Sequence, residues 1–144
     1  MTTMHAKTLK SKLLGTLRYE KEFNWWTAKF VLGKGHRIDV TINDQEDMDK
    51  VVVAVEIRLT QLKKNELSLR EYAAKKLLKL ANEWAEGEKV TKEDFVSRLR
   101  LETIAFYNDL STGLYYDDGD LFWGHTITVD LDKRGKCTRA EFQG

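Results

Sequence analysis

Residues 115–125, YYDDGDLFWGH, bring carboxylates, an imidazole and large rings together in one short stretch. Asp117, Asp118, Asp120 and His125 form a set that can ligate a divalent metal or serve as acid and base. Aspartate also suits tight turns, because it tolerates left-handed backbone and hydrogen-bonds to its own turn amides. We favour the turn, and we predict no catalytic residue, no metal site and no cofactor.

A metal-assisted hydrolase is the alternative interpretation of the same carboxylates. A second imidazole would strengthen it, and His36, on a predicted strand, is the candidate that would join Asp118, Asp120 and His125. Nothing in the sequence brings His36 to the other three residues. An enzymatic function is therefore left open but is not favoured.

Residues 130–141 have the spacing of a calcium-binding loop, with acids at positions one and three, glycine at six and glutamate at twelve. Arg134 stands at position five, where a carboxylate belongs, and the flanking residues alternate as strands do. We therefore predict a β-hairpin here rather than an EF-hand.

Large rings occur as adjacent pairs on the predicted strands. Neighbouring strand residues point to opposite faces, so both rings of a pair cannot enter one core unless helices cover both faces of the sheet. Exposed rings beside acids are typical of binding surfaces. The predicted binding residues are Trp25, Trp26, Tyr115, Tyr116, Asp117, Asp118, Asp120, Phe122, Trp123 and His125.

The elements that position these residues are strands at both ends of the chain and helices in the middle. The alternation predicts strands at 13–19, 25–32, 36–42, 101–107, 114–116, 125–132 and 136–142. Apolar residues at helical spacing predict three helices: one capped by Asn43 or Asp44, one starting with a capping box at Ser68, and a short one capped by Thr91. The fold class is α+β, an antiparallel sheet with the helices on one face.

Composition indicates one globular domain, residues 1–144, with 42% hydrophobic and 33% charged residues. Residues 1–12 carry three lysines and no acid, and we expect them to form a frayed basic arm. A net charge of +1 gives no field that would draw the chain to nucleic acid or to an anionic membrane. One cysteine permits no internal disulfide, and no apolar run is long enough to span a membrane. We expect a cytoplasmic protein.

The chain resembles an uncharacterised bacterial domain-of-unknown-function family. The resemblance rests mainly on YDDGDLFWGHTITV at 116–129, with support from LGTLRY, WW, NEWAE, VTKEDFVSRLRLETIAFY and AEFQG. It implies no particular activity, although related small α+β bacterial domains look like immunity proteins of contact-dependent toxin systems.

The residues and the resemblance together predict a non-enzymatic interaction module, in one form an immunity-type inhibitor. Acidic and aromatic side chains from Asp117 to Trp123 would cover a basic site on a protein partner. The first alternative is a protein that binds a nucleotide or sugar in a pocket lined by Trp25, Tyr115 and Trp123. Membranes and nucleic acids are not expected partners, and the sequence leaves the oligomeric state open.

Overall fold

The computed structural model describes residues 8–84, 87, 89–122 and 124–143. The elements follow the chain as β1 (Leu9–Ser11), β2 (Gly15–Glu20), β3 (Trp25–Gly33), β4 (His36–Asn43), α1 (Met48–Trp84), α2 (Lys92–Arg98), β5 (Arg100–Phe106), β6 (Thr112–Asp117), β7 (Thr126–Leu131) and β8 (Cys137–Gln143). The α+β class is confirmed, and so is a sheet built from both ends of the chain.

The eight strands form one sheet in which they lie side by side in sequence order. Every neighbouring pair is antiparallel except β4 and β5, which are parallel. This single parallel pairing joins the N-terminal and C-terminal halves of the sheet. Parallel neighbours need a long crossover, and the helices supply it.

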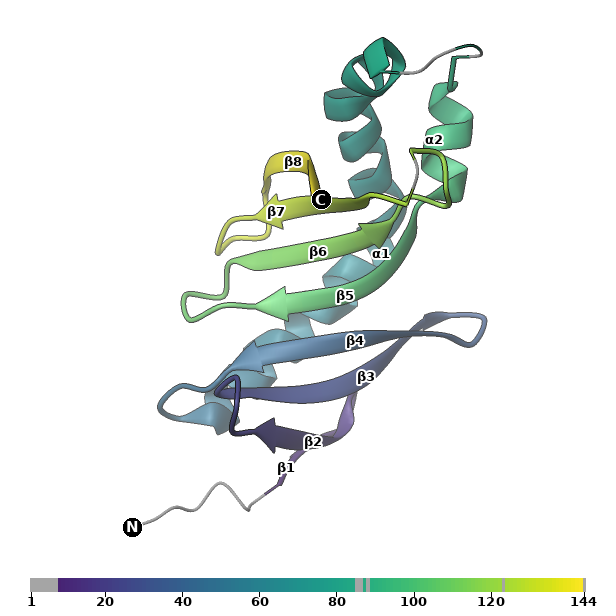
Figure 1. Cartoon of the computed structure of the whole chain (residues 1–144). Helices are drawn as coiled ribbons and strands as arrows, with labels where there is room; N and C mark the ends of the chain where they lie inside the picture. Colours follow the sequence, from purple (N-terminus) through teal and green to yellow (C-terminus); the bar gives the residue numbers. More distant parts are fainter. Residues whose placement is uncertain (1–7, 85–86, 88, 123, 144) are drawn as a thin grey trace.

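Helix α1 runs across one face of the sheet and reaches from β1 to β8 (Figure 1). Its apolar stripe includes Met48, Val52, Val55, Leu59 and Leu77, all buried. Helix α2 packs beside α1, and no described helix lies on the opposite face of the sheet. The prediction of helices on one face therefore holds for α1, and it leaves the other face open.

The prediction of three helices is wrong, because the first two are one continuous helix in the described chain. Ser68 lies inside α1, so the apparent capping box is not a helix start. The helix also begins later than predicted, at Met48 rather than after Asn43 or Asp44. Asn43 ends β4, and a carboxylate oxygen of Asp44 accepts a hydrogen bond from the Trp26 indole at 2.9 Å.

A polar contact in the middle of α1 explains why the helix continues through its charged segment. Glu66 lies on the buried stripe between Leu62 and Leu69 and accepts a hydrogen bond from the Tyr116 hydroxyl at 3.0 Å. Arg70 pairs with Glu66 and donates to the Val96 carbonyl of α2 at 2.9 Å. Burial, with Glu66 beside the ring, raises the pKa of Tyr116. The sheet and both helices thus meet at one polar cluster.

Two smaller expectations have definite outcomes. Thr91 caps α2 as predicted, since its hydroxyl accepts the Asp94 N–H at 3.1 Å. The expected basic arm does not extend through residue 12, because Leu9–Ser11 pairs with β2 and the Ser11 hydroxyl donates to Glu56 at 2.6 Å. Residues 1–7 of that arm lie outside the described residues. None of the described helices is long and apolar enough to cross a membrane.

Candidate functional site

The loop between β6 and β7 is organised by Asp118, whose side chain is completely buried. Its Oδ1 accepts the N–H of Asp120 at 2.8 Å. Its Oδ2 accepts the N–H groups of Phe122 and His125, each at 3.0 Å. Three backbone donors at one carboxylate tie Asp120, Phe122 and His125 to Asp118, as aspartate does in tight turns.

The same loop is fixed to α2 and to β8. Gly119 has φ +62° and lies against Arg98: a Cβ at this position would come within 2.6 Å of the Arg98 carbonyl oxygen. The Phe122 ring packs on Phe95 of α2 and Phe142 of β8, with centroids 5.6 and 5.3 Å away. The arrangement is a structural connection between elements.

The ten predicted binding residues fall into different environments. Trp26, Tyr116 and Phe122 are core residues, and burial keeps their rings from any partner in the folded chain. Asp118 holds the loop, while Asp117, Asp120 and His125 are partly or fully accessible at its surface. Trp25 and Tyr115 lie on the open face of the sheet, and Trp123 lies outside the described residues.

The carboxylates and imidazoles do not gather around one point. His36 begins β4, whereas the Asp118 loop follows β6, and β5 lies between those strands. The His125 Nδ1 is in hydrogen-bond contact with the Phe122 carbonyl. Among the described residues, no group of three His, Cys, Asp or Glu side chains could hold a metal ion. Residues 130–141 form the predicted hairpin of β7 and β8.

The open face of the sheet presents short polar side chains in register. Thr27 of β3 lies opposite Thr41 of β4, which lies opposite Ala105 of β5. In the next row, Asp39 pairs with Thr103, and Thr103 pairs with Tyr115. A groove of about 870 Å³, open to solvent, runs over β2–β5 above these small residues. The hollow forms because short side chains occupy its middle and longer side chains surround them.

An aromatic pair and two polar contacts border the groove. The rings of Phe23 and Trp25 stack with centroids 4.8 Å apart, and Phe23 is 53% exposed. The Trp25 indole donates to Glu20 at 2.9 Å. Lys29 and Asp39 form an ion pair across β3 and β4. The border therefore offers an apolar platform beside charged groups of both signs.

A second aromatic pair covers the neighbouring part of the face. The hydroxyl oxygens of Tyr107 and Tyr115 are 2.9 Å apart, and both rings lie over Gly113. A Cβ on Gly113 would come within 2.8 Å of the Tyr107 hydroxyl, so a larger residue here would displace this tyrosine layer. Burial, and next the hydrogen bond with Tyr115, raise the pKa of Tyr107. Together the two tyrosines offer hydroxyl groups and ring edges on this part of the face.

A family model described as an uncharacterised protein conserved in bacteria, DUF2262, matches residues 11–142. The chain belongs to the DUF2262 family. The match includes both helices and all of the sheet except Leu9, Lys10 and Gln143, and it confirms the family resemblance seen in the sequence. No curated protein and no solved structure matches the chain.

Several residues that line the groove of this DUF2262 chain were not predicted from the sequence, among them Thr27, Lys29, Asp39, Thr41 and Thr103. Phe23, which stacks on Trp25 at the border, was not predicted either. The alternation of Thr27 and Lys29 with buried Trp26 and Phe30 was an available signal for outward side chains. The parallel pairing of β4 and β5 was not available, because it joins residues more than sixty positions apart.

Proposed function

We propose that the chain is a non-enzymatic interaction module that binds a protein partner through the open face of its sheet. The observation that supports this most is the groove beside the Phe23–Trp25 pair, on a face that no described helix covers. Aromatic anchors beside a polar surface are typical of energetically dominant interface positions.

The shape and charge of this face suggest how a partner would bind. An apolar side chain of the partner would pack on Phe23 and Trp25, while the threonine hydroxyls of the floor would exchange hydrogen bonds with its polar groups. Glu20 and Asp39 lie at the border together with Arg18 and Lys29, so a partner would present charges of both signs here rather than only the basic site expected from the sequence. Such charges accelerate association more than they add affinity.

The test is affinity capture from the native bacterium with wild type and with a Phe23→Ala, Trp25→Ala variant. Neither ring is fully buried, so the variant should fold. The matched control is Val53→Ala, Ile57→Ala, which removes two exposed apolar side chains from α1. With the captured protein purified, we expect the groove variant to bind about thirtyfold more weakly and the control to bind normally.

The inhibitor form of the proposal adds a second readout. If the captured partner is an enzyme or toxin, wild type should inhibit its activity and the groove variant should do so only at higher concentration. A partner that both variants lose equally, or that the groove variant retains at unchanged affinity, would remove the open face from the proposal.

A small ligand is the second candidate, favoured by the volume of the groove. At about 870 Å³ it falls within the size range of small-molecule sites, although such sites usually enclose most of the ligand. Thermal-shift screening with nucleotides and sugars tests this candidate. A ligand that raises the Tm of wild type, but not that of a Trp25→Ala variant, would favour it over the protein partner.

A further inference from the structure

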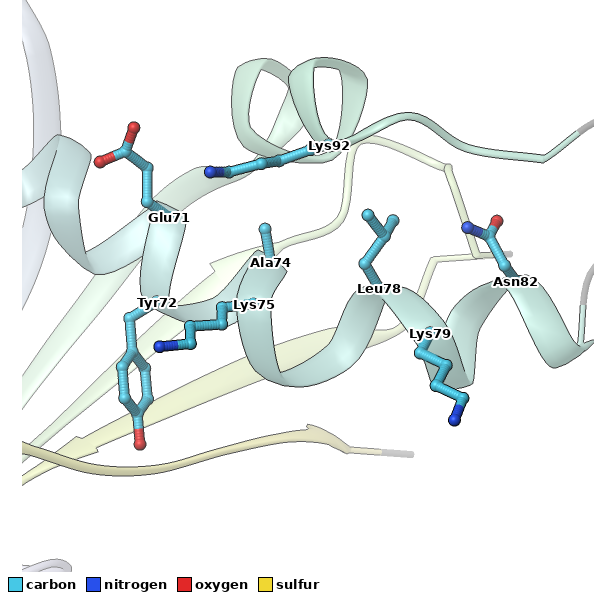
Figure 2. Close-up of a pocket in the computed structure, with 8 residues that line it drawn as sticks. All are labelled: Glu71, Tyr72, Ala74, Lys75, Leu78, Lys79, Asn82 and Lys92. Atoms are coloured by element: carbon cyan, nitrogen blue, oxygen red, sulfur yellow. The ribbon is translucent and has the colours of Figure 1, made fainter.

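A second hollow, of about 620 Å³, lies along the C-terminal half of α1 and at the start of α2. Figure 2 shows Ala74, Leu78 and Asn82 on the side of α1 that faces Lys92, whereas the Tyr72 ring points away from Lys92. Ala74 is buried and Leu78 packs partly against the core. The hollow therefore has an apolar floor, separate from the open face of the sheet.

Cations dominate the rim of this hollow. Lys75, Lys79 and Lys92 line it, and none of them forms an ion pair with a described residue. Glu71 is the single carboxylate in the lining. An adjoining hollow shares Lys79 and adds Lys89, whose ammonium donates to the Asn82 carbonyl at 2.7 Å. The local charge is positive although the whole chain is nearly neutral.

We propose that this hollow, the α1–α2 groove, binds an acidic amphipathic helix of a protein partner. The apolar side of such a helix would pack on Leu78, and its carboxylates would reach Lys75, Lys79 and Lys92. Helices that bind in grooves use this combination of an apolar face with complementary charge. The inference does not depend on the open-face proposal, since the two surfaces share no residue.

A nucleic acid is the competing anionic partner, and the groove fits it less well. The floor includes Ala74 and Leu78, so it suits the apolar side of an amphipathic helix better than a phosphate backbone. Nucleic-acid surfaces depend on many cations along a backbone and carry a strong overall positive charge. This chain has a net charge of only +1.

Fluorescence anisotropy with a labelled acidic amphipathic peptide of about 15 residues tests the proposal. The groove variant is Lys75→Glu, Lys79→Glu, and the matched control is Lys63→Glu, Lys64→Glu, with the same charge change on exposed α1 positions outside the groove. At low salt we expect saturable binding to wild type, about tenfold weaker binding to the groove variant and little change in the control. Circular dichroism checks that both variants fold.

Three results would overturn the proposal. The first is an equal loss of binding in both variants, which would indicate attraction to the overall charge. The second is unchanged binding of a peptide with every glutamate replaced by glutamine, and the third is tighter binding of a single-stranded oligonucleotide that displaces the acidic peptide. Failure here leaves the Phe23→Ala, Trp25→Ala result unaffected, so the two proposals fail separately.

Discussion

The loop around Asp118 is conspicuous in the sequence but largely closed in the structure, whereas the groove on the open face is inconspicuous in the sequence but accessible in the structure. The loop contains acids, rings and a histidine within a few positions, yet the Asp118 carboxylate and the Phe122 ring make only contacts inside the protein. The groove combines residues from four strands, and no short stretch of sequence reveals it. The stretch richest in acids and rings therefore proved to be a structural connection. The accessible surface is instead formed by residues that strand pairing brings side by side.

Replacing Asp118 with alanine tests most directly whether the loop has a structural role. Three backbone N–H groups would lose their acceptor inside a closed loop, and each buried unsatisfied donor is costly. We expect the free energy of unfolding, measured in urea, to fall by about 3 kcal/mol or more.

The matched control for Asp118→Ala is Asp117→Ala. Asp117 accepts one backbone bond, from Gly119 at 3.1 Å, and its residue is partly accessible. Its loss should be about 1 kcal/mol. Equal losses in the two variants would mean that the number of backbone bonds does not determine the stability of the loop.

Gly119→Ala tests the connection between the loop and α2. The substitution places a methyl group against the Arg98 carbonyl and also strains a left-handed residue, so we expect a loss of about 2–3 kcal/mol. Gly124→Ala is the control: its φ is +78°, but the nearest atom is 3.9 Å away, so only the backbone strain of about 1 kcal/mol applies. Thermal unfolding compares them, and similar Tm values would show that the contact with Arg98 yields without cost.

Local patterns were sufficient for the parts of the fold that depend on neighbouring residues. Alternation placed Trp25 and Trp26, and Tyr115 and Tyr116, on opposite faces, because successive strand residues must diverge. The Thr91 cap was also predictable, since a hydroxyl and an N–H three residues later suffice for it. Such features need no knowledge of distant segments.

Distant contacts account for what the sequence could not predict. The capping-box pattern at Ser68 suggested the start of a second helix, but Glu66, two positions earlier, accepts a hydrogen bond from Tyr116, fifty positions away, in the middle of one continuous helix. The floor of the groove depends on the parallel pairing of β4 with β5 across both helices. No local pattern predicts the Glu66–Tyr116 contact or the β4–β5 pairing, because both form only when the whole sheet is assembled.

Asp130→Asn tests whether a charge on the open face contributes to the stability of the fold. Of the substitutions discussed, we expect this one to change stability least. Asp130 lies on β7 opposite Gly113, where burial raises the pKa of its carboxyl; Arg139 opposes this shift and Glu141 adds to it. With a folded pKa above the ordinary value, the native state binds more protons than the unfolded state, so this residue lowers stability as pH rises through that window.

The asparagine variant lacks this titration. Its Tm should therefore exceed that of wild type near pH 7 by an amount corresponding to less than about 1 kcal/mol, because solvent screens a partly exposed group. The difference should shrink as the pH falls below the ordinary aspartate value of 3.8, where the wild-type carboxyl is protonated in both states. A variant less stable than wild type at pH 7 would mean that attraction to Arg139 outweighs burial. Charges on this face would then contribute to the fold as the Asp118 carboxylate does, and the contrast between the two regions would weaken.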